Sequence, residues 1–178
     1  NGLSEQEEDA VIAARAAEAA AEKPWYRYYV LGILTVVMMF SIADRLVFSI
    51  LVEDIKADFR LSDTQIGLLA GAAFSVTYVL FGFIAARLAD RSSRKNITGA
   101  AIAFWSLMTA ISGAATGYWT LFMARVGVGM GEAASGPASQ SLIADYFRRE
   151  ELGRAMGFLT IGATLGTAGG MMAGGLLA

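Results

Sequence analysis

Five long apolar stretches separated by short polar segments dominate the chain from residue 28 onward. They cover residues 28–51, 66–88, 97–115, 119–144 and 155–178. Each is long enough for the roughly 20 residues that an α-helix needs to cross a bilayer. The pattern therefore predicts an all-α integral membrane protein with about five transmembrane helices in this chain.

A polar, alanine-rich segment precedes these stretches. Ser4 and Glu7 have the spacing of a capping box, and the alanines that follow favour a helix. Pro24 ends this helix, because a proline inside a helix removes a backbone hydrogen bond. We therefore divide the chain into an N-terminal helix in residues 1–24 and a transmembrane bundle in residues 25–178. The bundle is expected to be incomplete, as part of a longer protein.

Basic residues are distributed unequally between the two sides of the predicted membrane. The N-terminal side holds most of them, namely Lys23, Arg27, Arg87, Arg91, Arg94, Lys95, Arg148, Arg149 and Arg154. The loops of the other side contain only Lys56 and Arg60. Since cytoplasmic loops carry an excess of Lys and Arg, we expect a multi-pass protein of the cell membrane with a cytoplasmic N-terminus.

Composition narrows the range of functions. Hydrophobic residues make up 56% of the 178 residues, too many for an ordinary soluble domain. Cysteine and histidine are both absent, which removes the common metal ligands and many catalytic groups. We therefore expect no enzymatic activity, no metal site and no cofactor, and proton chemistry must use Asp and Glu. The net charge of −2 gives no indication of nucleic acid binding.

Four ionisable residues lie inside the apolar stretches, where each charge costs about 2.5 to 3.5 kcal/mol at the centre of a membrane helix. They are Asp44 and Arg45 in the first stretch, and Arg125 and Glu132 in the fourth. Counting about 1.5 Å per residue from the helix ends places Asp44 and Arg125 at similar depths. We therefore predict an ion pair between Asp44 and Arg125 across the first and fourth helices.

Glu132 lies nearer the middle of the membrane by the same count, and no partner is expected at its depth because Arg45 lies at a different height. Desolvation of an unpaired carboxyl favours its protonated form. A carboxyl that gains and loses a proton inside a membrane is the chemistry of proton coupling. A purely structural role for the Asp44–Arg125 pair stays open, because loss of one buried partner is destabilising whatever the function.

Small residues recur every four positions in three of the stretches. The three series are Gly67, Gly71 and Ser75; Gly127, Gly131 and Ser135, with Gly129 beside them; and Gly162, Gly166, Gly170 and Gly174. This spacing keeps small residues on one face of a helix, where two backbones can approach closely. We predict helix contacts along these three faces.

Several of these motifs resemble those of the major facilitator superfamily. The loop between the second and third stretches resembles its motif A, with Asp90, Arg91, Arg94 and Lys95 present and Ala86 and Ser93 where glycine is usual. The fourth stretch resembles its arginine motif, with Arg125 and Gly129 present and Val128 where glutamine is common. The fifth resembles its glycine motif, with Gly162, Gly166, Gly169 and Gly170 present and Thr167 in place of proline.

Within the superfamily, four segments are most similar to the spinster lipid transporters. They are IADR at 42–45, LSDTQIGLL at 61–69, AIAFWSL at 101–107, and GVGMGEA running on to LIADYF at 127–147. The resemblance covers residues 28–178. It implies a fold of twelve helices in two pseudo-symmetric halves, of which this chain holds most of the N-terminal helical bundle.

The resemblance also implies a secondary active transporter that moves a lysolipid or sphingoid-type lipid by alternating access, coupled to protons. Asp44 and Glu132 would be the protonation sites, and Arg45 and Arg125 would bind an anionic headgroup. A cytoplasmic latch of ion pairs would consist of Asp90, Arg91, Arg94 and Asp145. Cavity surface for acyl chains could come from Met38, Met39, Phe40, Phe48 and Phe74. The expected partners are a lipid or another amphipathic anion, protons and membrane lipids, and we expect a monomer.

Two alternatives stay open. An organic-anion symporter of the same superfamily would also carry DR in its first helix and GEA in its fourth. A membrane receptor that binds lipid without transporting it belongs to a different class. Competition by short hydrophilic acids would favour the symporter, and lipid binding without flux would favour the receptor.

Overall fold

The computed structural model describes residues 24–91 and 94–177, and every regular element in these ranges is helical. In chain order the elements are α2 (Pro24–Ile50), α3 (Val52–Asp58), α4 (Asp63–Gly67), the π-helix η1 (Leu68–Ala72), α5 (Ala73–Arg91), α6 (Arg94–Gly113), α7 (Tyr118–Tyr146) and α8 (Arg149–Leu177). The prediction of an all-α fold is confirmed. The N-terminal helix expected in residues 1–24 lies almost entirely outside the described residues.

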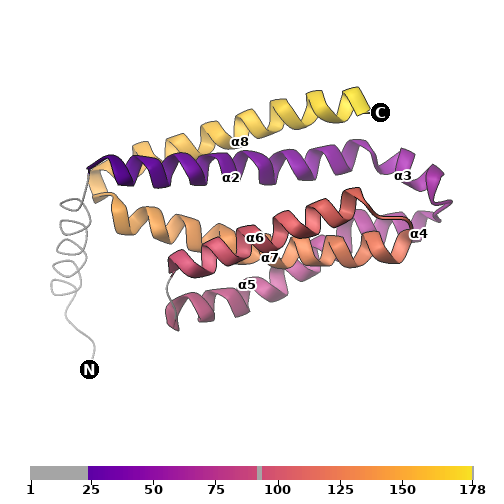
Figure 1. Cartoon of the computed structure of the whole chain (residues 1–178), viewed down its shortest axis with the longest axis horizontal. Helices are drawn as coiled ribbons and strands as arrows, with labels where there is room; N and C mark the ends of the chain where they lie inside the picture. Colours follow the sequence, from indigo (N-terminus) through magenta and orange to yellow (C-terminus); the bar gives the residue numbers. More distant parts are fainter. Residues whose placement is uncertain (1–23, 92–93, 178) are drawn as a thin grey trace.

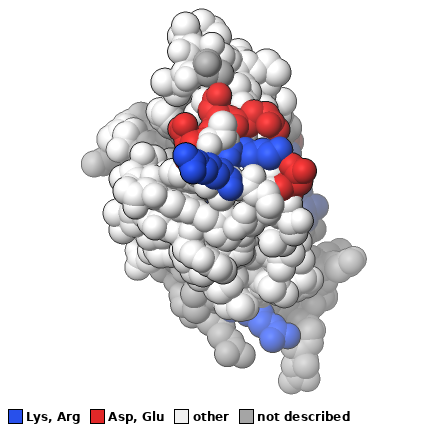
Figure 2. All heavy atoms as spheres, turned by 90° about the vertical axis from the view of Figure 1, so that its right-hand side faces the viewer, with Lys and Arg blue, Asp and Glu red and all other residues white. Residues whose placement is uncertain are grey.

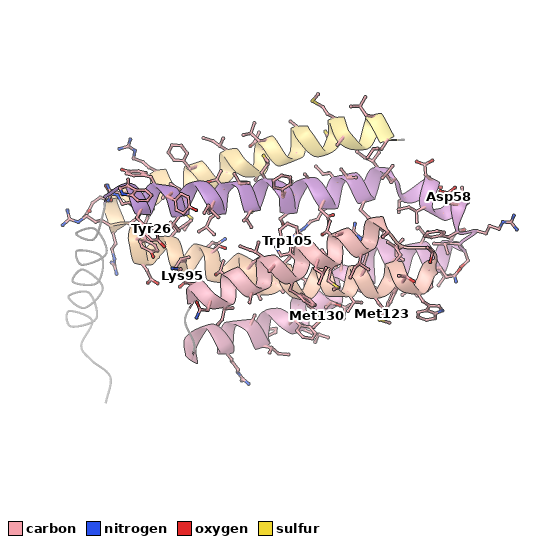
Figure 3. All side chains as sticks on the ribbon, viewed as in Figure 1. Tyr26, Asp58, Lys95, Trp105, Met123 and Met130 are labelled. Atoms are coloured by element: carbon pink, nitrogen blue, oxygen red, sulfur yellow. The ribbon has the colours of Figure 1, made fainter. Side chains whose placement is uncertain are left out.

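The long helices form two groups that lie side by side along the length of the molecule (Figure 1). One group is α2 packed against α8, and the other is α7 packed against α5 and α6. Successive long helices run in opposite directions, so the starts of α2, α6 and α8 share one end of the bundle. Figure 3 shows Tyr26 and Lys95 towards this end and Asp58 at the opposite end.

The outside of the bundle is apolar along its sides. Phe83, Trp119 and Met172 are 74%, 69% and 70% exposed. Within the described part of the chain, three segments are long and apolar enough to cross a membrane, namely Trp25–Ile50, Asp63–Ala85 and Arg149–Leu177. Charged side chains gather instead over α3 and α4 at one end (Figure 2) and comprise Glu53, Asp54, Lys56, Asp58, Arg60 and Asp63. Apolar sides with a charged end suit a bundle surrounded by lipid.

The contact between α2 and α8 depends on glycine. The buried face of α8 includes Gly162, Gly166, Gly170 and Gly174. A Cβ atom at Gly162 would lie 2.5 Å from the carbonyl oxygen of Thr35, and one at Gly170 would lie 2.9 Å from the Cα atom of Ala43. The two backbones therefore touch directly, which a residue with a side chain would prevent. The predicted helix contact along this face of α8 is confirmed.

The glycines of α7 point in two directions. Gly127 and Gly131 face α6, where added Cβ atoms would meet the side chains of Met108 and Trp105. Gly129 faces α5, where a Cβ atom would lie 2.9 Å from the carbonyl oxygen of Phe74. These close approaches let α7 pack against two helices at once. The predicted helix contact is confirmed for Gly127 and Gly131, whereas the contact of Gly129 with a second helix was not predicted.

The third series of small residues behaves differently. Gly67, Gly71 and Ser75 are exposed, and within the described part of the chain no atom lies close enough to contact a Cβ atom added at either glycine. The predicted helix contact along this face is therefore not formed among the described residues. Its spacing resembles that of the other two series, but no described helix lies opposite it.

An apolar cluster joins α2, α7 and α8 at the end where α2 begins. Its buried members are Leu31, Leu34, Ile143, Phe147, Ala155 and Leu159. Beside it, Nη1 of Arg27 donates to Oε2 of Glu151 at 3.0 Å, and the Arg27 guanidinium lies 5.4 Å from the centre of the Phe147 ring. This end of the space between the two helix groups is thus filled by side chains.

Candidate functional site

Two arginine–carboxylate pairs connect α2 to α7. In the first, Nη1 of Arg125 donates to Oδ2 of Asp44 at 2.8 Å. The two side chains are 5% and 17% exposed, and the guanidinium of Arg125 lies 3.5 Å from the centre of the Phe48 ring. The predicted ion pair between Asp44 and Arg125 is confirmed, and it is enclosed.

The second pair joins Arg45 to Glu132. Nε of Arg45 donates to Oε2 of Glu132 at 2.9 Å, and Nη2 donates to the same oxygen. The expectation that Glu132 lacks a partner was therefore wrong. It rested on backbone heights, whereas an arginine side chain has a long apolar stem that carries its charged group away from its own backbone.

The two members of the second pair differ in exposure. The side chain of Glu132 is 2% exposed, whereas that of Arg45 is 41% exposed. Both bonds from Arg45 go to Oε2, while the buried Oε1 of Glu132 has no hydrogen-bond partner among the described residues. Glu132 is therefore held inside the helix bundle, and its cationic partner lies at an open edge.

Two aromatic rings from α5 contact the Arg45 guanidinium. It lies 4.6 Å from the centre of the Phe74 ring and 5.6 Å from that of Tyr78. The rings stack on each other with their centres 5.7 Å apart and an angle of 28° between their planes. A cation over aromatic faces is stabilised by their quadrupoles.

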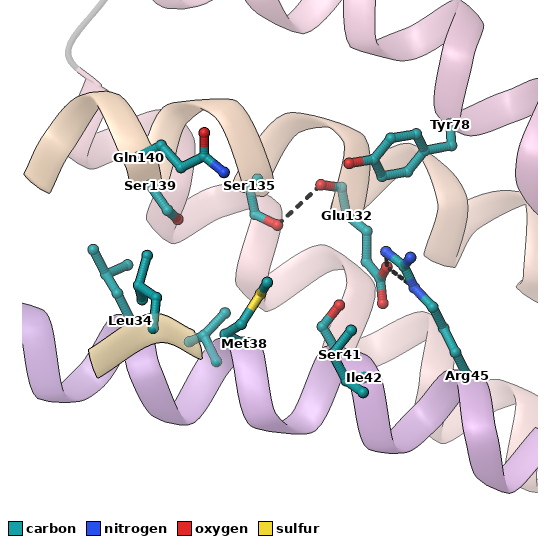
Figure 4. Close-up of a pocket in the computed structure, with 13 residues that line it drawn as sticks. Leu34, Met38, Ser41, Ile42, Arg45, Tyr78, Glu132, Ser135, Ser139 and Gln140 are labelled. Carbon is teal, nitrogen blue, oxygen red and sulfur yellow. Dashed lines mark hydrogen bonds and ion pairs between the residues drawn. The ribbon is translucent and has the colours of Figure 1, made fainter. Parts of the chain in front are cut away.

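A cavity of about 280 Å³ opens beside Arg45 and Glu132, mainly between α2 and α7 (Figure 4). The wall formed by α7 is polar and includes Glu132, Ser135, Ser139 and Gln140. The wall formed by α2 is largely apolar and includes Leu34, Val37, Met38 and Ile42, with Ser41 and Arg45 as its polar members. Such a cavity can hold a molecule with an anionic group, further polar groups on one side and an apolar part on the other.

The aromatic and methionine residues predicted for cavity surface have separate roles. Met38 lines the cavity. Phe48 and Phe74 stack on arginines instead. Phe40 is 56% exposed, and the backbone of Met39 lies under Gly166 of α8.

The predicted cytoplasmic latch is only partly covered by the structure. The side chains of Asp90, Arg91 and Arg94 lie outside the described residues. Asp145 is exposed in the last turn of α7. The latch therefore stays a prediction.

Sequence reasoning missed part of the cavity wall. Ser135 and Ser139 follow Glu132 at intervals of three and four residues, which places all three on one face of α7. This spacing could have identified them. The Arg27–Glu151 pair gave no such signal, since its members are 124 residues apart in the chain.

Several known proteins are similar to this chain in sequence. A profile of the Major Facilitator Superfamily matches residues 33–178. An MFS-type efflux pump of Mycolicibacterium smegmatis is 34% identical over 83% of this chain and 34% of its own length. A probable L-galactonate transporter of Escherichia coli is 33% identical over 70% of this chain and 27% of its own length. Spinster homolog 1 of Xenopus tropicalis is 31% identical over 80% of this chain and 27% of its own length.

The fold is also similar to that of a solved structure. A bacterial homolog of the human lysosomal transporter spinster, in an inward-facing and unoccupied conformation, matches with a TM-score of 0.80 and 38% sequence identity. The match covers 86% of this chain and 32% of that structure, so the chain spans about a third of the length of the proteins it resembles. The chain therefore belongs to the major facilitator superfamily, and its helices have the arrangement seen in a spinster homolog.

Proposed function

We propose that this chain is part of a secondary active transporter that moves a lysolipid or sphingoid-type lipid across the cell membrane by alternating access, coupled to protons. The observation that carries the proposal is the Arg45–Glu132 pair, with its carboxylate buried and its guanidinium at the edge of a cavity. Membership of the superfamily and similarity to spinster proteins support a transport function.

Arg45 is the group proposed to bind the substrate's anionic headgroup. Its bonds to Glu132 use Nε and Nη2, which leaves Nη1 for a further acceptor. A guanidinium forms strong hydrogen bonds with phosphate and carboxylate oxygens. The apolar cavity wall of α2 would contact the lipid part of the substrate, and the polar wall of α7 would form hydrogen bonds with its hydroxyl or amine groups.

Glu132 is proposed to carry the coupled proton. Its Oε2 is bound by Arg45, so the unbonded Oε1 is the oxygen at which a proton would add. Protonation would remove the negative charge that holds the guanidinium and would free Arg45 for an anion. Asp44 would release Arg125 in the same way. Because proton and substrate would favour different conformations, their binding would drive the transport cycle.

The bundle is proposed to have one orientation in the membrane. The end of the bundle that carries Arg27, Lys95 and Arg148 would face the cytoplasm, since basic residues concentrate on that side of membrane proteins. The latch of Asp90, Arg91, Arg94 and Asp145 would act at the same end. We propose a monomer as the working unit.

The test is flux of a fluorescent lysolipid in proteoliposomes that contain the full-length transporter, with and without an imposed pH gradient. Wild type is compared with Asp44→Asn and Glu132→Gln, each checked for folding. The proposal expects gradient-driven flux that both variants lose. Flux that is unchanged in both variants contradicts the coupling mechanism, and lipid binding without any flux supports a receptor.

A second candidate is a proton-coupled organic-anion symporter. The polar wall of α7, with Ser135, Ser139 and Gln140, offers partners for a molecule with several hydroxyl groups. The similarity to a probable L-galactonate transporter agrees with such a substrate. Competition of the lysolipid flux by L-galactonate, or uptake of radiolabelled L-galactonate where lysolipid flux is absent, would favour this function.

A further inference from the structure

The stacked rings of Phe74 and Tyr78, named here the aromatic shelf, are not explained by the proposed function. They contact Arg45 from α5, a helix that contributes neither acid nor base to the two ion pairs. Arg45 is thus held on one side by a carboxylate and on another by two aromatic faces. The quadrupoles of the rings attract a guanidinium whatever the charge of Glu132.

An irregular turn just before α5 determines the direction in which the aromatic shelf points. The π-helix η1 ends immediately before α5, and the backbone N–H of Ala73 donates to the carbonyl of Leu68, five residues earlier. A π turn holds one residue more than an α turn, so it rotates everything after it by about 100° relative to what comes before. Irregular turns of this kind are frequent at functional sites.

The rotation fixes which residues of α5 face α7 and which face α2. Ala73 and Thr77 are 4% and 8% exposed, and Gly129 of α7 packs against this part of the helix. Phe74 and Tyr78 follow them directly in sequence and are one turn apart. They therefore point past α7 towards Arg45, and Tyr78 also lines the cavity (Figure 4).

We propose that the aromatic shelf is a second holding position for Arg45, which keeps the guanidinium at the cavity when Glu132 does not bind it. Phe74 and Tyr78 are then positioning residues for the anion-binding group. Because Asp44 is bound to Arg125, the two rings are described groups that can still hold the Arg45 guanidinium once Glu132 is neutral. The inference rests on the proposed function in treating Arg45 as the group that binds the substrate.

The test follows Arg45 itself and needs no substrate. The full-length transporter in detergent is treated with phenylglyoxal, which modifies guanidinium groups, and the labelling rate of each arginine is measured by mass spectrometry. Phe74→Leu is made in two backgrounds, wild type and Glu132→Gln. The shelf predicts that Phe74→Leu accelerates labelling of Arg45 by at least about fivefold in Glu132→Gln and by less than about twofold when Glu132 is present.

Matched variants separate ring stacking from general packing. Phe74→Trp and Tyr78→Phe keep aromatic faces, so they should restore slow labelling of Arg45 in the Glu132→Gln background. Phe48→Leu removes a ring from Arg125 instead, so it should accelerate labelling of Arg125 and leave Arg45 unchanged. Arg27 is bound to Glu151 at the far end of α2, and its labelling rate monitors folding in every variant.

Two results would overturn the inference. Equal acceleration by Phe74→Leu in both backgrounds would show that the rings act whether or not Glu132 binds, and no acceleration in either would show that they do not hold the guanidinium. If Arg27 is also labelled faster in Glu132→Gln, the series is repeated with Glu132→Asp, whose shorter side chain withdraws the carboxylate. Because labelling does not require transport, a failure of the proposed function leaves this result readable.

Discussion

The two sides of α2 pack in opposite ways. Towards α8, Gly162, Gly166 and Gly170 bring the backbones into direct contact over about two helical turns, and Gly174 makes room for the side chain of Ile50. Towards α7, α2 makes few backbone contacts and is joined by two ion pairs beside a cavity. The first side is filled by backbone atoms and cannot take up another group. The second side is closed by the apolar cluster at the start of α2, and beside the cavity it is held by charges that water, a proton or an anion can replace.

The difference indicates where movement can occur. Close backbone packing transmits displacement, because any change in separation produces a clash or a void. An ion pair at a cavity can exchange partners while both helices keep their fold. We therefore expect α2 and α8 to move together, and expect adjustment to take place between α2 and α7.

Gly166→Leu should have the largest effect, because it disrupts the close packing of α2 against α8. An added side chain would enter the backbone of Met39, with its Cβ atom 3.0 Å from the Met39 Cα. Backbone atoms cannot move aside as a flexible side chain can, so we expect no folded protein to be recovered. Size-exclusion chromatography of the detergent-solubilised transporter measures this.

Gly169→Leu is the control for that variant. Gly169 is in the same helix and nothing lies within 4 Å of its added Cβ atom in the described structure. The elution profile of Gly169→Leu should match that of wild type. A monodisperse Gly166→Leu protein would show that the contact with α8 is not the rigid side of α2.

Asp44→Asn should have the next largest effect, because it breaks the enclosed ion pair with Arg125 between α2 and α7. It leaves the guanidinium of Arg125, 5% exposed, without an anionic partner. Removing one member of a buried pair typically costs about 3 to 5 kcal/mol. The melting temperature in detergent should fall by about 10 °C. The double variant Asp44→Leu with Arg125→Met should recover much of the loss, and a double variant as unstable as the single one would refute this account.

Glu132→Gln should destabilise the protein less than Asp44→Asn. The partner of Glu132 is 41% exposed, so water can solvate Arg45 when the carboxylate is gone. We expect less than half of the loss in melting temperature seen for Asp44→Asn, combined with loss of gradient-driven flux. A fall in melting temperature as large as that of Asp44→Asn would mean that both pairs serve mainly to hold the helices together.

Loss of the ion pair between Lys56 and Asp63 should have the smallest effect. The pair lies at the charged end of the bundle and belongs neither to the contact between α2 and α8 nor to that between α2 and α7. A hydrogen bond and the charge of Lys56 lower the pKa of the Asp63 carboxyl, and the hydrogen bond and charge of Asp63 raise the pKa of Lys56. Asp63 is 89% exposed, so water screens the pair. Asp63→Asn should change the melting temperature at pH 7 by less than about 2 °C.

The sign of the pH dependence follows from the two pKa directions. The contribution of Asp63 is present above its ordinary pKa of 3.8 and is lost as pH falls through the lowered value. That of Lys56 is present below its ordinary pKa of 10.5 and is lost as pH rises through the raised value. Wild type and Asp63→Asn should therefore melt increasingly alike towards either extreme of pH, and a difference that grows there would contradict the assignment.

The sequence predicted the helices and their contact faces better than it predicted which side chains are long enough to meet. Apolar length identified the helices, and glycine spacing identified the contact between α8 and α2, because both depend on local periodicity. Depth counting found Asp44 with Arg125, but it failed for Glu132 because a side chain several ångströms long is invisible to a count of backbone rise. The aromatic shelf could not be found from periodicity, since it depends on a π turn that changes the phase of α5.

The same spacing can also mislead. Gly67 and Gly71 have the pattern of the α8 glycines, yet in the described structure they face no other helix. A pattern of small residues indicates that a close contact is possible, and the neighbour that forms it must come from elsewhere in the fold. Sequence periodicity therefore predicts faces, and the topology decides which of them are used.

The order of the ion pairs along the chain has a consequence for biosynthesis. Asp44 leaves the ribosome 81 residues before Arg125, and Arg45 leaves it 87 residues before Glu132. At about 5 to 20 residues per second, α2 must wait roughly 4 to 17 s in the insertion machinery before its charges can be neutralised by α7. A helix carrying two unpaired charges is costly to release into lipid. The nascent α2 should therefore stay beside the translocon until α7 has been made, and nascent chains halted before residue 125 should crosslink to it through α2.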